Sequence, residues 1–267
     1  MSDNLHPLRP APESAQPRRR IVKDLPLTRL LPNMLTLLSL CSGLTGIRFS
    51  LSGKWEQAVL AIMVAAVFDV LDGRVARMLN IASKFGAELD SLSDAISFGV
   101  APGFIMYEWA LHDAGGFGWV AVLLFAVCCA LRLARFNTML DDHDAPAWAK
   151  RYFTGVPAPA GASLALLPMA YVLQFGEAAK APSALYAAWI IMVGALMVSR
   201  MPTFALKGWR IAPIWVAPVL VIAVAVVAGL ITNTWLTLSE LGTLYVIGLP
   251  LGWLSYRARE RKEATNG

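Results

Sequence analysis

Four aspartates, Asp69, Asp72, Asp90 and Asp94, have the residue type and the spacing for metal-dependent chemistry. Asp69 and Asp72 are three residues apart and Asp90 and Asp94 are four apart, so each pair shares one face of a helix. Carboxylate oxygens without histidine or cysteine select Mg²⁺ or Mn²⁺, and such ions commonly bind substrate phosphates as well. The sequence therefore predicts a divalent-metal site that acts on a phosphate-bearing substrate.

The helices that must position these aspartates are apolar. Residues 65–68, directly before Asp69, read Ala-Ala-Val-Phe, and a carboxylate at a membrane boundary is costly unless it is paired or binds a cation. A solvated loop would explain one or two such acids, but not two helical pairs on either side of a connection of about ten residues. We therefore expect a helical hairpin that brings the four carboxylates together.

The composition indicates a membrane protein. Charged residues make up 15% of the chain and hydrophobic residues 57%, whereas soluble domains carry about 25% charged residues. The net charge is +5, but the basic residues flank apolar runs and form no continuous face, which excludes nucleic acid as a partner and favours a lipid bilayer. The three cysteines lie in apolar stretches and form no disulfide or zinc pattern.

We predict an all-α fold, a polytopic membrane helix bundle with about eight transmembrane helices of roughly 20 apolar residues each. Their ranges are 32–51, 56–78, 90–111, 117–136, 155–175, 183–200, 212–231 and 236–256. The predicted organisation is a disordered cytoplasmic tail (1–20), an interfacial segment (21–31), a catalytic transmembrane core (32–200), two additional C-terminal transmembrane helices (201–256) and a cytoplasmic tail (257–267).

The distribution of positive charge predicts the orientation. With eight spans, all of the 23 Lys and Arg residues except Arg48, Lys54 and Lys180 fall on one side. Positive charge marks the cytoplasmic side. Both termini and the four aspartates are therefore expected to face the cytoplasm.

The aspartates belong to a longer motif. The stretch Asp69-x-x-Asp72-Gly73-x-x-Ala76-Arg77, followed by eight residues, Gly86, Asp90 and Asp94, fills all eight positions of the signature of the CDP-alcohol phosphotransferase family, which it resembles. The resemblance implies a six-helix core, a homodimer, and an enzyme that moves a phosphatidyl or related group from a CDP-linked lipid to an alcohol and releases CMP.

The same resemblance implies roles for these residues. Asp69, Asp72 and Asp90 would bind two divalent ions, Mg²⁺ or Mn²⁺, while Asp94 would lie at the metal site and act as the general base. Gly73, Ala76, Arg77 and Gly86 would form the CDP-lipid pocket. From the residues alone, Arg77 could equally be a topology anchor, and the small residues could equally serve helix packing.

Three further segments narrow the resemblance. Residues 30–46 (LLPNMLTLLSLCSGLTG), 130–137 (ALRLARFN) and 153–162 (FTGVPAPAGA) look like those of the bacterial membrane-bound phosphatidylserine synthases, over roughly residues 28–175. This implies that CDP-diacylglycerol and L-serine are the substrates and that the protein lies in the bacterial cytoplasmic membrane. It also places Asn33 and Thr36 near the CDP pocket, with a helix N-cap as the alternative.

Arg132, Arg135 and Asn137 lie at the cytoplasmic end of the fourth predicted span. A guanidinium can hold a carboxylate with two parallel hydrogen bonds, so we predict that these residues bind the serine acceptor. Simple membrane anchoring by the two arginines remains the alternative.

Two other functions stay open. The acceptor could be glycerol 3-phosphate, inositol phosphate or choline. A cation transporter could use the aspartates as an ion path, but it would need acids near the middle of the bilayer, whereas all four sit near one end of their helices.

Overall fold

The computed structural model describes residues 30–79, 81, 83–139, 152–199, 201–204 and 215–266. It confirms the all-α fold, and the helices are α1 (Leu31–Leu51), α2 (Trp55–Met78), α3 (Lys84–Asp94), α4 (Ala101–Met106), α5 (Gly115–Met139), α6 (Ala158–Phe175), α7 (Ser183–Val198), α8 (Val216–Thr232) and α9 (Thr234–Asn266). Two short strands, β1 (Tyr152–Thr154) and β2 (Pro202–Phe204), form an antiparallel pair that the sequence analysis did not anticipate. The predicted tail at 1–20 and nearly all of the interfacial segment lie outside the described residues.

Each of the eight predicted ranges contains a helix. Among the described residues, three helical stretches are long and apolar enough to cross a membrane: Leu31–Leu51, Lys84–Thr138 and Ala158–Phe175. Helices α7 and α8 are shorter but apolar, and α9 continues to Asn266, past the predicted boundary at residue 256. The number of membrane crossings stays a prediction.

The third predicted helix begins earlier than expected. It starts at Lys84 rather than at residue 90, because the Ser83 side chain caps the helix by accepting a hydrogen bond from the Gly86 N–H at 3.0 Å. The connection from α2 is therefore residues 79–83, about half the predicted length. Beyond Asp94 the chain stays helical through a π-helical segment, Ala95–Val100, into α4 and a second π-helical segment, Tyr107–Leu111.

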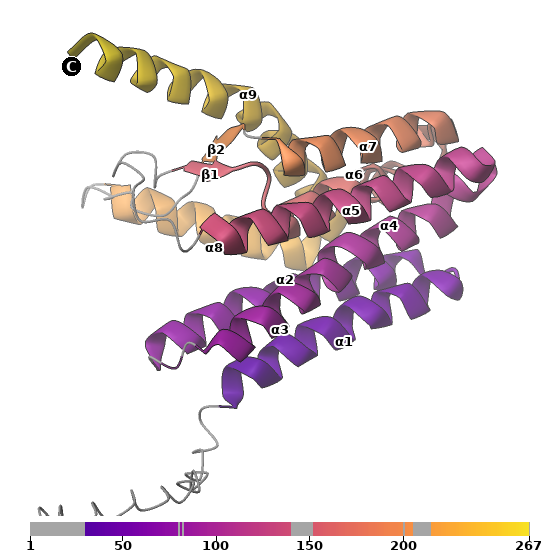
Figure 1. Ribbon diagram of the computed structural model, residues 1–267. Coiled ribbons are helices and arrows are strands. Elements are labelled where there is room, and N and C mark those ends of the chain that lie inside the picture. Colours follow the sequence, from indigo (N-terminus) through magenta and orange to yellow (C-terminus); the bar gives the residue numbers. More distant parts are fainter. Residues whose placement is uncertain are drawn as a thin grey trace, which may run out of the picture.

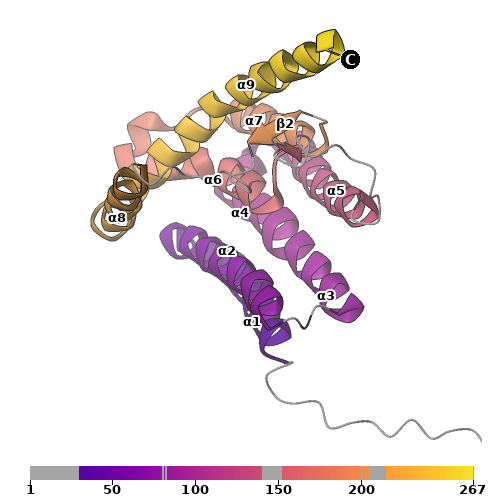
Figure 2. The ribbon, with the colours of Figure 1, turned by 90° about the vertical axis from the view of Figure 1, so that its left-hand side faces the viewer.

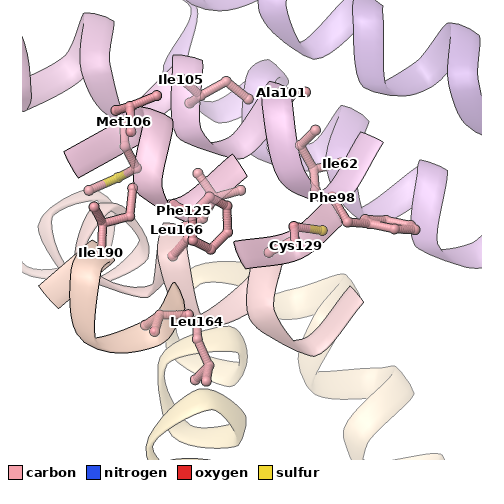
Figure 3. Close-up of a cluster of buried hydrophobic side chains, with 14 of the residues drawn as sticks. Ile62, Phe98, Ala101, Ile105, Met106, Phe125, Cys129, Leu164, Leu166 and Ile190 are labelled. Atoms are coloured by element: carbon pink, nitrogen blue, oxygen red, sulfur yellow. The ribbon is translucent and has the colours of Figure 1, made fainter. Parts of the chain in front are cut away.

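Helices α1, α2 and α3 lie side by side, and α5 and α7 lie on the other side of α4 (Figures 1 and 2). The buried core draws side chains from α2, α4, α5, α6 and α7, among them Ile62, Ile105, Phe125, Leu164 and Ile190 (Figure 3). Helix α8 packs against α9 at the outside of the bundle and carries no buried residue.

Small residues allow α1 to approach its neighbours closely. A Cβ atom placed on Gly43 would lie 2.8 Å from the Cα atom of Ser97, in the π-helical segment after α3. Side chains then link the backbones, because Ser39 donates to the Ala65 carbonyl of α2 at 2.9 Å and Ser97 donates to the Ser39 carbonyl at 3.3 Å. Such contacts hold membrane helices together where the hydrophobic effect cannot.

Candidate active site

Three of the predicted metal ligands converge. Asp69 and Asp72 of α2 and Asp90 of α3 each offer a carboxylate oxygen, and these three atoms all lie within 4.8 Å of one another. Asp72 is only 4% exposed, and the other two are half-buried. Three carboxylates this close repel one another in a poorly solvated site unless a cation lies between them. The donor set is hard oxygen, which fits Mg²⁺ or Mn²⁺.

Asp94 joins this cluster one helical turn after Asp90. It is buried, and its carboxyl group is within hydrogen-bonding reach of the Asp69 carboxyl group. Among the described residues, its Oδ1 atom is buried and has no hydrogen-bond partner. A buried carboxylate oxygen without a donor is costly, and a cation in the cluster would satisfy it.

Thr36 lies behind the metal ligands. Its buried hydroxyl lies 2.6 Å from Oδ2 of Asp72 and 3.1 Å from the carbonyl oxygen of Pro32, one turn earlier on α1. A hydroxyl has one proton, and the short bond to an ionised acceptor is the stronger of the two. Thr36 therefore orients Asp72 across the α1–α2 contact.

Asn33 lies at the contact between α1 and the first turn of α3. A Cβ atom on Gly86 would lie 3.2 Å from Oδ1 of Asn33 and 3.1 Å from Oγ of Ser83, so glycine lets the two helices meet here. The N-cap alternative for Asn33 is wrong, because the residue at the N-cap of α1 is Leu30.

The other predicted nucleotide-binding residues line a more open surface of α2. Within the part of the chain that the structure describes, a Cβ atom on Gly73 would meet nothing within 4 Å except the guanidinium of Arg77, at 3.7–3.9 Å. Ala76 is half-buried and Arg77 is exposed. The surface beside Asp72 therefore leaves room for a ligand.

The three predicted acceptor residues of α5 fall into different environments. The guanidinium of Arg132 is half-buried, lies 5.7 Å from the centroid of the Phe136 ring, and is within electrostatic range of Asp69 and Asp94. Asn137 donates to Oγ of Ser91 at 2.8 Å, so it ties α5 to α3. Arg135 is half-buried, and within the described ranges it forms no ion pair.

The sequence analysis missed the serines of α3 and the π-helical segment that follows it. Ser91 accepts from Asn137, Ser93 donates to the Thr36 carbonyl at 3.1 Å, and Ser97 donates to the Ser39 carbonyl. The recurrence of serine inside an apolar span was the available signal, because such hydroxyls need a partner in a membrane.

Comparisons with known proteins match most of the chain. The model of the CDP-alcohol phosphatidyltransferase family matches residues 29–201, and that of CDP-alcohol phosphatidyltransferase 2 matches residues 214–250. The similarity thus extends past residue 175, where the resemblance seen in the sequence ended.

Several curated relatives carry the name CDP-diacylglycerol–serine O-phosphatidyltransferase. The protein from Mycobacterium leprae is 41% identical over 226 residues, which is 83% of this chain and 74% of the relative. The Mycobacterium tuberculosis protein is 38% identical over a match that covers 86% of this chain and 80% of the relative. The Helicobacter pylori protein is 36% identical over a match that covers 68% of this chain and 76% of the relative. Together with the four clustered aspartates, these matches show that the chain belongs to the CDP-alcohol phosphatidyltransferase family.

Proposed function

We propose that this protein transfers the phosphatidyl group from CDP-diacylglycerol to the hydroxyl of L-serine, giving phosphatidylserine and CMP. The observation that carries the proposal is the convergence of Asp69, Asp72 and Asp90 in a chain that is similar, over most of its length, to enzymes named for this reaction. A site at the end of membrane helices suits a substrate whose nucleotide is soluble and whose acyl chains are not.

Asp69, Asp72 and Asp90 would hold two ions, Mg²⁺ or Mn²⁺, with Asp94 beside them. When bound, such ions neutralise the diphosphate and the charge that develops on departing CMP.

Asp94 is the proposed general base. It would accept the proton of the serine hydroxyl while the serine oxygen forms a bond to the phosphorus that carries diacylglycerol. The bond from this phosphorus to the CMP oxygen breaks, and CMP leaves with the electron pair. The burial of Asp94 beside Asp69 supports this role because it keeps the base next to the metal ligands.

The substrates would occupy opposite sides of the aspartates. The open surface at Gly73, Ala76 and Arg77 suits the nucleotide, and Asn33 and Gly86, which lie close together, are further candidates for binding it. Arg132 is the favoured partner for the serine carboxylate because it lies within electrostatic range of Asp69 and Asp94, and Arg135 is the second candidate.

We propose that the site faces the cytoplasm of a bacterial cell, with both termini on that side, and that the protein forms a homodimer. Ser52 and Gly176 are exposed at helix ends opposite the aspartates. Cysteines introduced there should react with an impermeant reagent added outside sealed cells, whereas a cysteine at Arg77 should be protected. Labelling of the cysteine at position 77 from outside would show that the site faces the opposite side of the membrane. Cross-linking in membranes tests the dimer.

The deciding experiment supplies purified protein and Mg²⁺ or Mn²⁺ with CDP-diacylglycerol and, separately, serine, glycerol 3-phosphate, inositol phosphate and choline. We expect CMP release and phosphatidylserine with serine alone. A different lipid product would correct the acceptor. Absence of CMP release with every alcohol would contradict the enzyme class and reopen the cation transporter.

A further inference from the structure

An apolar pocket lies next to the aspartate cluster, between α2, α6 and α9. Its volume is about 260 Å³, and only two of its lining side chains, Ser163 and Tyr245, carry a polar atom. A cavity of about 150 Å³ with an apolar lining already holds benzene. The pocket is therefore large enough for a longer hydrocarbon and has little to offer a polar ligand.

One end of the pocket lies close to the site. Ala66 lines it and lies one helical turn before Asp69 on α2. From α9, Tyr245 lines it as well, and the Tyr245 phenol is within electrostatic range of the Arg132 guanidinium. The pocket is therefore within reach of a long molecule whose polar end is held by the aspartates.

The pocket runs away from the aspartates along the helices. On α6 its lining extends from Pro159 to Ala170, a distance of about 16 Å at 1.5 Å per residue. On α2 it continues from Ala66 to Val59, and on α9 it ends at Leu238. Half of the hydrocarbon core of a bilayer is about 15 Å thick. The length of the pocket therefore matches that of one lipid acyl chain.

We propose that this pocket holds one acyl chain of the CDP-linked lipid, so that α9 helps to select the lipid by chain length; this rests on the proposed function, which supplies the lipid substrate. Helix α9 lies beyond the first family match, which ends at residue 201. Its contribution is a wall made by Leu238, Leu241, Gly242 and Tyr245. At Gly242 this wall comes close to α6, because a Cβ atom there would lie 2.5 Å from Cδ1 of Leu167, itself a lining residue that would have to move.

Leu238→Trp tests the proposal by blocking the far end of the pocket. Leu238 is half-buried, so the larger side chain can be accommodated with little disturbance to the core. In Leu238→Trp we expect kcat/KM for dioleoyl CDP-diacylglycerol to fall about tenfold relative to kcat/KM for the didecanoyl lipid. The reason is that each methylene group that no longer fits in a pocket lowers kcat/KM severalfold. Leu244→Trp is the matched control, because Leu244 is 67% exposed on the same helix and does not line the pocket. An unchanged ratio in Leu238→Trp, with both lipids turned over, would overturn the pocket while leaving the proposed function intact.

Photolabelling of the unaltered protein provides a second measurement in case Leu238→Trp fails to fold. CDP-diacylglycerol with a diazirine near the end of one acyl chain should label α6 and α9 around Leu238 and Leu241, and excess unlabelled CDP-diacylglycerol should suppress the labelling. Equal labelling by a phosphatidylcholine probe, or labelling confined to α8, would show that only bulk lipid reaches these helices and would overturn the proposal. Failure of the wild-type protein to turn over any CDP-diacylglycerol would instead contradict the proposed function.

Discussion

The aspartate-bearing helices and the C-terminal helices are held in different ways. Between α1, α2 and α3, glycine and serine bring backbones into contact, and hydroxyls such as those of Ser39 and Ser93 bond directly to carbonyl groups of the neighbouring helix. Helix α8 has no buried residue, and side chains such as Leu220 and Ile222 are more than half exposed. Metal ligands need fixed oxygen positions, which the first arrangement provides. Hydrocarbon chains need only apolar volume, and they do not require such fixed positions.

Removing a charge from the first region should have the largest effect. Asp72→Asn replaces a carboxylate with an amide, a poor ligand for a hard dication, and we expect turnover to fall by at least about 10²- to 10³-fold at any Mg²⁺ or Mn²⁺ concentration. Glu240→Gln is the control in the second region, because Glu240 is an exposed acid on α9. CMP release measures both. Near-normal activity of Asp72→Asn at saturating metal would show that Asp72 is not a metal ligand. It would also contradict the contrast drawn between the aspartate-bearing helices and the C-terminal helices.

Asp94→Asn separates the base from the ligands. If Asp94 acts mainly as the base, turnover should fall by about 10²- to 10⁴-fold while CDP-diacylglycerol still binds. Equilibrium binding of the lipid and CMP release should be measured on the same preparation. Loss of binding in parallel with turnover would make Asp94 chiefly a metal ligand.

Thr36→Val tests whether the hydrogen bond behind Asp72 matters. Valine keeps the shape but cannot donate to Oδ2 of Asp72, and loss of such an orienting bond commonly costs about 10- to 100-fold in metal affinity or activity. We expect Thr36→Val to need a higher Mg²⁺ concentration for activity, and Thr36→Ser, which keeps the hydroxyl, to need the same concentration as the unaltered protein. Thr45→Val is a matched control on the same helix, because its hydroxyl bonds only to the Cys41 carbonyl, one turn back on α1. Equal metal requirements in the two valine variants would contradict an orienting role for Thr36.

The membrane-helix fold and the acidic cluster could be predicted because both follow from local patterns. Apolar runs locate the helices, and spacings of three and four place acids on shared faces. The early start of α3 was missed because Lys84 and Glu88 make its first turns polar, so a search for apolar windows begins later. The contact of Ser93 with Thr36 joins residues far apart in the chain, and no local pattern encodes it.

Arg132 and Arg135 also show that a local sequence pattern does not predict which side chains meet across helices. Their spacing on one helix suggests a common face, and among the described residues it is Arg132 that the structure brings within electrostatic range of Asp69 and Asp94. Which side of α5 faces the acids depends on how α3 and α5 pack, and that contact is fixed by the bond from Asn137 to Ser91. The sequence supplied the candidates, and the packing of the helices distinguished them.

Arg132→Lys and Arg135→Lys turn this distinction into a measurement. Lysine cannot make two parallel bonds to a carboxylate, so we expect Arg132→Lys to raise the KM for serine about tenfold, with little change in that for CDP-diacylglycerol. The effect of Arg135→Lys should be smaller. Steady-state kinetics in detergent micelles, with each substrate varied in turn, measures both constants. A change in the lipid constants alone would reassign Arg132 to the diphosphate.

The smallest effect concerns stability and compares one glycine from each region. Gly43→Ala places a methyl group 2.8 Å from the Cα atom of Ser97, so two backbones must separate, at a cost of about 1–3 kcal/mol. Gly248→Ala on α9 meets nothing within 4 Å, and alanine favours a helix over glycine by about 1 kcal/mol. Thermal unfolding in detergent should therefore show a lower midpoint for the first variant and an unchanged or slightly higher one for the second. Because α1 carries Thr36, the Gly43 variant should also need more Mg²⁺ for activity, whereas the Gly248 variant should not. Equal midpoints and equal metal requirements would mean that close packing of α1 does not hold the aspartates in place.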